Sequence, residues 1–462
     1  GNIGPEASKP VMEGKGLLFK IFADIDVFDI EVNENDPEKF IQTVKAIAPT
    51  FGGINLEDIK APESFEIERR LVEELDIPVM HDDQHGTAII SCAALINALE
   101  VVDKKIDEVK IVISGAGGAA ISCTRLYRSF GANRDNIIMI DSTGVIRKDR
   151  PNLSKEKEEF ATDRKIDTLA EAMVDADVFV GLSVADIVSP EMLLSMANDP
   201  IVFAMANPNP EIAYDLAIAT RPDVLMATGR SDHPNQVNNV LGFPYIFRGA
   251  LDVRATKINE AMKIGAVKAI AELAKSPVPE QVNIAYGQKR LTFGREYIIP
   301  KPLDPRLIGV VPVAVAKAAI ASGVAKYPIT DWEAYSEKLL ERLGSHNKLI
   351  RILTDRAKSN PKKIVFAEAE LLNVLKAAQI VKDDNIAIPI LLGNKEIIQQ
   401  IIEENGLELE GVEIIETALE PARMKKFADA LYTKRQRRGI TLFEAQKLMR
   451  DRNYFGAAMV EF

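Results

Sequence analysis

The sequence predicts an α/β protein with a doubly wound parallel sheet, a smaller domain before it and a second, partial α/β domain after it. Three observations carry this prediction. Short apolar runs alternate with helix-like segments between residues 86 and 245, a glycine-rich string joins the first of these runs to a helix, and a strand–helix alternation starts again near residue 363. Strands that alternate with helices are typical of parallel sheets covered by helices.

The composition narrows the class of protein. The chain has 462 residues, 47% of them hydrophobic, as in ordinary globular proteins. A net charge of -11 argues against a nucleic-acid-binding surface. Two cysteines, Cys92 and Cys123, predict a reducing compartment without disulfides. No apolar run is long enough to span a membrane, and residues 1–5 do not resemble a signal peptide, so we expect a soluble cytoplasmic protein.

The amino-terminal part contains a carboxylate pair after a short apolar run. Glycines precede residues 54–56, a predicted strand that ends at Glu57 and Asp58. A strand is also expected at residues 23–30, which alternate in polarity. Helices are expected at residues 7–22, 38–48 and 64–74, the last with Ser64 as its N-cap.

A second acidic pair follows in residues 81–88, His-Asp-Asp-Gln-His-Gly-Thr-Ala. Glu57, Asp58 and Asp83 together would make an oxygen-rich site suited to Mg²⁺ or Mn²⁺. Asp82 and Asp83 could instead cap a helix that begins near Gly86. The residues alone leave both interpretations open.

Three further polar side chains have a plain structural explanation. Lys15, in a Glu-Gly-Lys-Gly string, is typical of a solvated helix face when judged from its segment alone. His81 and His85 could be metal ligands, but histidines hydrogen-bonded within a loop are the more frequent case.

The glycine-rich string predicts a Rossmann-type dinucleotide site. Residues 109–114 are an apolar strand, and Gly115-Ala116-Gly117-Gly118-Ala119-Ala120 leads into a helix that ends near residue 129. This is G-x-G-x-x-A in its required context. Gly115 permits the tight turn, Gly117 allows the backbone to approach a pyrophosphate, and Ala120 allows close helix packing. The amides that begin the helix, at Gly118 and Ala119, would hold the phosphates.

Asp141 ends the next strand, residues 136–140, at about the spacing expected for the carboxylate that binds the ribose. It favours a free 2′-hydroxyl, whereas Arg147 and Lys148 nearby could meet a 2′-phosphate. NAD and NADP therefore both remain open.

Later strands extend the sheet and bring polar residues to its carboxyl edge, where ligands bind. Ser183 and Asn207 follow the predicted strands 178–182 and 201–205, and Gly229 ends the predicted strand 224–229. The asparagines of residues 235–239 are typical of a turn, but the amides of Asn207 and Asn239 could hold a substrate carboxylate. Helices are predicted at residues 169–175, 190–196, 250–275 and 311–322, and an extended segment at 296–300.

The carboxyl-terminal part changes in character. Charged helices are expected at residues 332–343 and 346–359, and strands at 363–368, 386–392 and 412–415, with helices at 372–382, 396–404 and 423–432. The basic run 434–438 is a solvated helix end or a contact for a phosphate-bearing ligand. The predicted domains are 1–85, 86–245, 246–335, which returns to the first, and 336–462.

Taken together, these strings resemble the large bacterial malic enzymes that carry a carboxyl-terminal phosphotransacetylase-like domain. The matching strings are residues 3–6, 11–15, 51–58, 81–88, 115–120, 206–211 and 235–239, and the tail from 364 to 456 resembles the first part of a phosphotransacetylase. The resemblance implies a homo-oligomeric enzyme that converts malate to pyruvate and CO₂ with NAD or, preferentially, NADP and with Mg²⁺ or Mn²⁺. It also implies acetyl-CoA as an effector of the tail.

The resemblance implies roles for individual residues. Lys15 matches the general base for the C2 hydroxyl, a role that requires a lowered lysine pKa. Asp82 would lie beside it. Glu57, Asp58 and Asp83 match the metal ligands, and Asn207 and Asn239 would hold the substrate.

Two departures from the family lead to further expectations. The family's enol-protonating tyrosine and malate-binding arginine precede the stretch with which this sequence starts, so we expect a chain with a weakened or absent decarboxylating step. Ala369 stands where the family has glycine, and the acyl-transfer residues would follow Phe462, so acetyl transfer is not expected. Two alternatives are a metal-independent dehydrogenase of the amino-acid type and a non-catalytic regulatory or assembly module that binds dinucleotide or acetyl-CoA.

Overall fold

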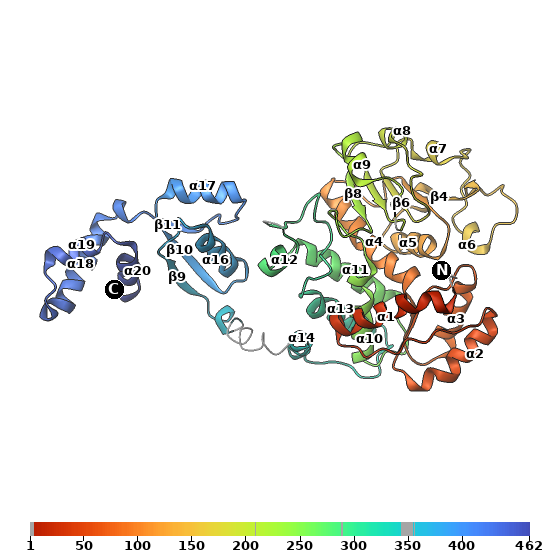
Figure 1. Ribbon diagram of the computed structural model, residues 1–462, viewed down its shortest axis with the longest axis horizontal. Coiled ribbons are helices and arrows are strands. Elements are labelled where there is room, and N and C mark those ends of the chain that lie inside the picture. The colour runs from red at the N-terminus through yellow and green to blue at the C-terminus, as the bar shows by residue number, and fades with distance from the viewer. Residues whose placement is uncertain (1–3, 208, 288–289, 343–353, 355) are drawn as a thin grey trace. The chain divides into compact units, whose positions relative to one another are not determined.

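The computed structural model describes residues 4–207, 209–287, 290–342, 354 and 356–462 (Figure 1). The chain forms two compact units. The first unit comprises Gly1–Ser276 and Thr292–Leu343, and the second comprises Pro277–Leu291 and Gly344–Phe462. The finer domain boundaries predicted from the sequence stay predictions, although the helix α4 (Asp82–Val101) passes residue 86 without a break.

A six-stranded sheet forms the centre of the first unit. Its strands lie in the order β5 (Gly144–Val145), β4 (Ile137–Asp141), β3 (Ile111–Ser114), β6 (Val178–Gly181), β7 (Ile201–Ala204) and β8 (Leu225–Thr228). All neighbours are parallel except β5, which is antiparallel to β4. From β3 the chain first adds β4 and β5 on one side, and it then returns to add β6, β7 and β8 on the other side. The strand order therefore reverses at β3, and the predicted doubly wound sheet is confirmed.

Two apolar cores cover the two faces of this sheet. Because successive strand residues face opposite sides, Ile111 and Ile113 join one core and Val112 the other. The first core contains residues of α4, α5 (Gly118–Ser129), α10 (Phe243–Asp252), α11 (Glu260–Lys275) and α13 (Leu307–Ala321). The second contains residues of α7 (Leu169–Met173), α8 (Pro190–Leu194) and α9 (Tyr214–Thr220), seen above the sheet in Figure 1.

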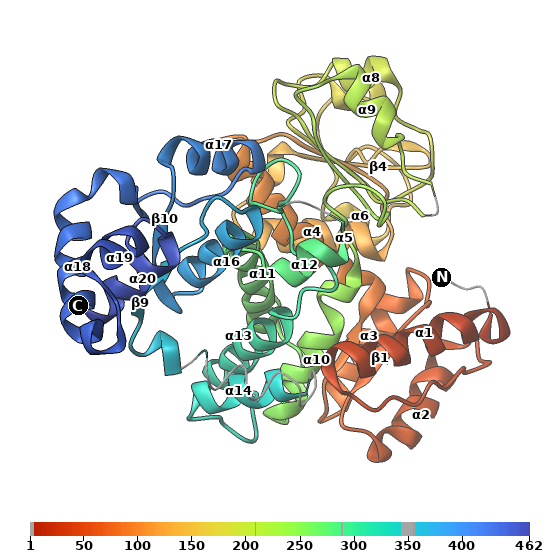
Figure 2. The ribbon, with the colours of Figure 1, turned by 60° about the vertical axis from the view of Figure 1, so that its left-hand side comes forward.

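The amino-terminal part of this unit is built on two short parallel strands. β1 (Ile54–Leu56) pairs with β2 (Val79–His81), with Leu56 opposite His81. The helices α1 (Pro5–Ala23), α2 (Pro37–Ile47) and α3 (Glu63–Glu74) lie around them (Figure 2). In a parallel pair both carboxyl ends reach the same edge, so the two acidic pairs, which follow Leu56 and His81, are brought together there.

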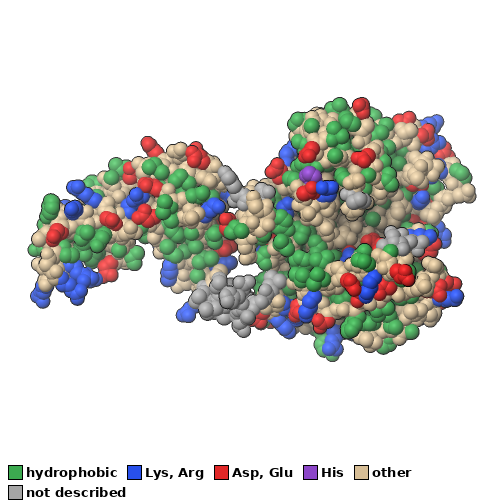
Figure 3. Space-filling view, viewed as in Figure 1, with side chains coloured by type: hydrophobic (Ala, Val, Ile, Leu, Met, Phe, Trp, Pro, Cys, Tyr) green, Lys and Arg blue, Asp and Glu red, His purple; other side chains and the backbone are tan. Residues whose placement is uncertain are grey.

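The second unit contains a smaller parallel sheet in the order β11 (Glu413–Ile415), β10 (Ala387–Leu392) and β9 (Lys362–Phe366). Its helices are α12 (Glu280–Ala285), α16 (Leu372–Asp383), α17 (Lys395–Asn405), α18 (Pro421–Arg435), α19 (Leu442–Leu448) and α20 (Arg452–Glu461). An ion pair of 3.3 Å between Lys376 Nζ and Glu280 Oε1 holds α12 in this unit. The basic run 434–438 is exposed at the end of α18, where Figure 3 shows lysine and arginine side chains gathered.

Several local predictions are wrong. Residues 24–30 form no strand and make no β-bridge to another described segment, and α1 ends at Ala23 with Asp24 in the left-handed region (φ 50°). Ser64 is not the N-cap of α3, since that helix already begins at Glu63. Residues 296–300 form only an isolated bridge, between Gly294 and Tyr297. The helix predicted at 346–359 lies largely outside the described residues.

None of the helices in the described part of the chain has the length and apolar character needed to cross a lipid bilayer.

Candidate active site

The two acidic pairs meet at the carboxyl edge of β1 and β2. The backbone N–H of Asp58 donates to Asp83 Oδ2 over 3.0 Å. Asp58 adopts a positive φ of 56°, and the chain bends there, directly after Glu57. Asp82 is the first residue of α4 and makes no capping bond, so the helix-cap interpretation of this acidic pair is wrong.

Lys15 of α1 extends into this acidic edge. Its ammonium lies 3.2 Å from Glu57 Oε1, hydrogen-bonds to Asp82 Oδ2 and lies 4.3 Å from the centroid of the Phe243 ring. The Lys15 side chain is only 14% exposed. The interpretation of Lys15 as a solvated helix residue is therefore wrong, and the lysine is instead the counter-charge of a buried acidic cluster.

Burial and charge act against each other in this cluster. Burial raises the pKa of Glu57 to about 8 although Lys15 opposes the shift, and burial likewise raises the pKa of Asp82. Burial alone would lower the pKa of Lys15, but Asp82 and Glu57 outweigh it and the pKa is raised. The lowered lysine pKa expected from the family resemblance is therefore not found in this ion-paired state.

The donor set fits a hard divalent cation in its chemistry. Glu57, Asp58, Asp82 and Asp83 supply four carboxylates at one edge, and Asp82 Oδ1 is buried without a hydrogen-bond partner. Within the described ranges, however, no group of three or more acidic, histidine or cysteine side chains is arranged so that it could hold a metal ion. The assignment of Glu57, Asp58 and Asp83 as ligands therefore stays a prediction.

A second buried network supports the turn from β2 into α4. Glu68 of α3 accepts from the backbone N–H of His81 over 2.8 Å and lies 2.9 Å from His85 Nε2, while Lys263 Nζ lies 2.9 Å from His85 Nδ1. Burial opposes ionisation of Glu68, but His85 and Lys263 outweigh it and lower its pKa to about 2. His85 is thus satisfied by protein groups. His81 Nε2 lies 3.2 Å from the Ile59 carbonyl oxygen.

Sequence reasoning missed Glu68 and Lys263, because each lies in an amphipathic helix with many charged residues and its partners are distant in sequence.

We expect Glu68→Gln to lower the free energy of unfolding by about 3 kcal/mol, as when one member of a buried charged network is removed. Urea denaturation would measure this. Glu66→Gln on the same helix is the matched control, since Glu66 forms an exposed pair with Arg69. Equal losses for the two variants would contradict the assignment.

The glycine-rich loop has the conformation that a dinucleotide site requires. Gly115 has a φ of 120°, and a Cβ there would lie 2.6 Å from the Leu182 carbonyl oxygen. Gly117 precedes α5, and a Cβ on it would meet no atom within 4 Å, so the backbone faces open space. Gly118 and Ala119 begin α5, and Ala120 is buried in the core. The loop thus presents backbone amides at a helix N-terminus, as predicted.

Polar residues gather at the carboxyl ends of the neighbouring strands. Ser183 Oγ lies 2.9 Å from Ser114 Oγ, and the buried Glu211 carboxylate accepts from the N–H groups of Ser183 and Ala206 over 3.1 and 3.0 Å. Burial raises the pKa of Glu211. Glu211 therefore links the loop after β6 to the loop after β7 through these hydrogen bonds. No local sequence pattern predicts this role.

The two substrate-binding candidates have different neighbours. Asn207 lies against Gly229, since a Cβ added to Gly229 would be 3.2 Å from Asn207 Oδ1. Asn239 donates to Asp82 Oδ2 over 3.1 Å and accepts from Thr87 Oγ1 over 3.1 Å. Within the described part of the chain no hydrogen bond joins the two amides, so the structure brings Asn239, but not Asn207, to the acidic cluster.

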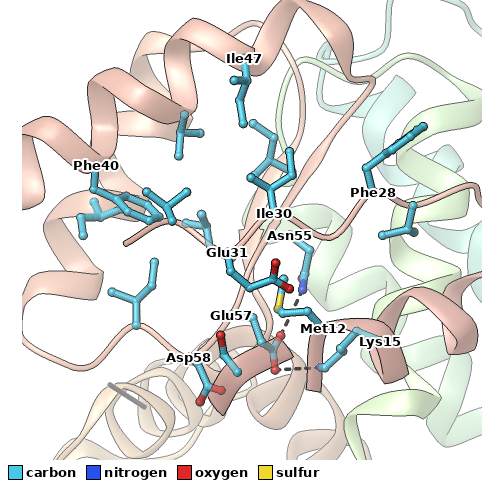
Figure 4. A pocket seen from close by; sticks show the side chains of 18 of the residues that line it. Met12, Lys15, Phe28, Ile30, Glu31, Phe40, Ile47, Asn55, Glu57 and Asp58 are labelled. Atoms are coloured by element: carbon cyan, nitrogen blue, oxygen red, sulfur yellow. Dashed lines mark hydrogen bonds and ion pairs between the residues drawn. The ribbon is translucent and has the colours of Figure 1, made fainter. Parts of the chain in front are cut away.

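A cavity of about 560 Å³ opens beside Lys15. Lys15, Glu57 and Asp58 line its polar end, whereas Phe28, Phe40 and Ile47 belong to its apolar part (Figure 4). The polar end is where a small anionic substrate could contact the acidic cluster and the lysine.

Comparisons with known proteins agree with this arrangement. Residues 1–72 match the family model "Malic enzyme, N-terminal domain", residues 84–287 match "Malic enzyme, NAD binding domain" and residues 348–462 match "Phosphate acetyl/butaryl transferase".

Similar proteins include two bacterial NADP-dependent malic enzymes. That of Salmonella typhimurium is 52% identical over 100% of this chain and 61% of its own length, and that of Halomonas elongata is 58% identical over 71% and 78%. The crystal structure of malic enzyme from Pyrococcus horikoshii superposes with a TM-score of 0.68 at 41% identity, covering 77% of this chain and 81% of that one. This chain spans about 61% of the length of the Salmonella typhimurium enzyme and of two further NADP-dependent malic enzymes that it matches. The chain belongs to the malic enzyme family, and it carries a phosphotransacetylase-type domain in its carboxyl-terminal part.

Proposed function

We propose that this protein oxidises malate at C2 and converts it to pyruvate and CO₂, with NADP or NAD as hydride acceptor and Mg²⁺ or Mn²⁺ at the acidic cluster. The observation that carries the proposal is the contact of Lys15 with Glu57 and Asp82, two buried carboxylates from different strand ends, at the polar end of a cavity. The malic enzyme relatives and the glycine-rich loop support the substrate and the cofactor.

The residues divide the chemistry between them. When bound, a divalent cation held by Glu57, Asp58 and Asp83 would polarise the C2 oxygen, and the nicotinamide would accept the hydride. Lys15 takes the proton of the C2 hydroxyl after giving up its own proton. Asp82, whose pKa is raised by burial and which hydrogen-bonds to Lys15, is the neighbouring group able to accept that proton. Asn239 fixes Asp82, and Asp82 in turn positions Lys15.

The metal requirement separates this function from its nearest alternative. With malate, NADP and Mn²⁺ we expect NADPH to form, EDTA to abolish the reaction and added Mn²⁺ to restore it. Pyruvate is measured separately from NADPH, because oxidation at C2 and decarboxylation are separate steps. NADPH formation that EDTA leaves unchanged would favour the metal-independent dehydrogenase. Cofactor binding without turnover would favour the non-catalytic module. The family match favours neither of these two alternatives.

The second unit is proposed to bind acetyl-CoA and to contribute to a homo-oligomer. The match of residues 348–462 to the phosphate acetyl/butaryl transferase family and the exposed basic residues of 434–438 support a phosphate-bearing ligand. Calorimetric titration with acetyl-CoA tests the first part, and sedimentation analysis tests the second. Heat changes no larger than those of dilution, or a monomer at all concentrations, would contradict the respective part.

A further inference from the structure

A buried carboxylate at the ends of β6 and β7 has no part in the proposed chemistry. Glu211 is fully buried. Its Oε1 accepts from the Ser183 N–H over 3.1 Å, and its Oε2 accepts from the Ala206 N–H over 3.0 Å. Within the described residues no lysine or arginine forms an ion pair with it, so backbone N–H groups are the partners of its charge. Burial of a carboxylate without a cation is costly, and stability alone is therefore a poor reason for this residue.

The strand β6 leaves the space that this carboxylate occupies. A Cβ added to Gly181, the last residue of β6, would lie 2.2 Å from Glu211 Cδ. A larger residue at position 181 would therefore displace the carboxylate. The Met205 N–H also donates to the Gly181 carbonyl oxygen over 3.1 Å, so the chain after β7 is tied to the end of β6 beside the carboxylate.

The loops that Glu211 holds flank the crevice of the sheet. The strand order reverses at β3, and a doubly wound sheet binds its ligand outside the carboxyl ends of the strands at this point. β3 leads into the glycine-rich loop, and its neighbour β6 leads into Leu182 and Ser183. The two loops are in contact, since a Cβ added to Gly115 would lie 2.6 Å from the Leu182 carbonyl oxygen. Glu211 therefore fixes one wall of the crevice.

The two halves of the sheet bind different parts of a dinucleotide. β3, β4 and β5 carry the glycine-rich loop and Asp141, which pairs with Arg150 and Lys157. In the Rossmann fold this first half binds the adenosine part, which leaves the second half, β6 to β8, for the nicotinamide part. Asn207 follows β7 in this second half and is exposed. The loops that the buried carboxylate holds both belong to the second half.

We propose that Glu211 is a positioning residue for the nicotinamide half of the cofactor site. It fixes the loops after β6 and β7 and, through them, the side chains of Ser183 and Asn207. Glu211 does not itself contact the cofactor, because its carboxylate is buried and both of its oxygens are engaged by the loops. The inference rests on the proposed dinucleotide-dependent function and adds to it a residue outside the proton-transfer and metal groups.

Binding of NADPH and of its adenosine part to the whole chain tests this role without turnover. In Glu211→Gln an NH₂ group replaces one oxygen and faces a backbone N–H, so the side chain can hold only one of the two loops. We expect this variant to bind NADPH about tenfold more weakly in calorimetry, the effect of losing one hydrogen bond to a charged group. Binding of adenosine 2′,5′-bisphosphate should change by less than about twofold, because the first half of the sheet is intact.

Two further variants complete the test. Gly181→Ala reaches the same carboxylate from β6, so it tests the role even where Glu211→Gln fails to fold, and it should give the same selective loss of NADPH binding. Glu191→Gln is the matched control, since Glu191 is an exposed carboxylate on α8 in the same half of the sheet. It should bind both ligands as the unmodified chain does.

The outcomes separate this role from the proposed function. Unchanged NADPH binding in a folded Glu211→Gln or Gly181→Ala protein would overturn the positioning role. An equal loss for both ligands would also overturn it, because a general loss of structure then explains the result. No binding of either ligand to the unmodified chain would instead overturn dinucleotide binding itself.

Discussion

Replacing Lys15 by methionine is expected to lower the rate of malate-dependent NADPH formation by about 10²- to 10⁴-fold, the range that a positioned proton-transfer group contributes. Methionine approximates the length of the lysine chain but cannot exchange a proton. It also leaves Glu57 and Asp82 without their cationic partner. The measurement is kcat/KM for malate at saturating NADP and Mn²⁺.

The same helix supplies the control for this variant. Lys9 lies on α1, is 45% exposed on its side chain and pairs with Asp29. Lys9→Met should change the rate by less than about twofold, since exposed ion pairs contribute little. Lys15→Met should still bind NADP, because the glycine-rich loop lies on other elements. A folded Lys15→Met protein with the rate of Lys9→Met would contradict the assignment of Lys15 as the proton acceptor.

The second large effect is expected in metal binding. Asp83→Asn should weaken Mn²⁺ binding by more than the roughly 10- to 100-fold that outer-shell partners of metal sites contribute. Asparagine keeps an oxygen that can accept from the Asp58 N–H, so the turn can be retained while the negative charge is lost. Titration of free Mn²⁺ by electron paramagnetic resonance gives the affinity.

Asp76→Asn is the matched control for the metal experiment. Its side chain is 75% exposed and pairs with Lys326, and we expect it to leave Mn²⁺ affinity unchanged. If Asp83→Asn binds Mn²⁺ as tightly as Asp76→Asn does, the acidic edge of β1 and β2 is not the metal site.

The dinucleotide part was predictable because its signals are local. The strand β3, the turn at Gly115 and the helix α5 follow one another within about twenty residues, and each has its own sequence pattern. The acidic edge was also predictable in outline, since Glu57 and Asp83 follow short apolar strands that a parallel pair aligns.

The remaining features depend on contacts between distant residues. Residues 23–30 alternate in polarity, but alternation gives a strand only where a partner strand is available. Arg147 and Lys148 were named as cations near Asp141 because they are close to it in sequence, whereas Arg150 and Lys157 are the residues that pair with Asp141 in the fold. The raised pKa of Lys15 likewise arises from Asp82 and Glu57, which no pattern around Lys15 reveals.

The fate of the hydrogen at C2 of malate is the most direct test of hydride transfer assisted by Lys15. With malate deuterated at C2, NADP and Mn²⁺, we expect deuterium to appear at C4 of the reduced nicotinamide and Lys15→Met to suppress this transfer. Reduced cofactor without deuterium, or transfer that is undiminished in Lys15→Met, would contradict it.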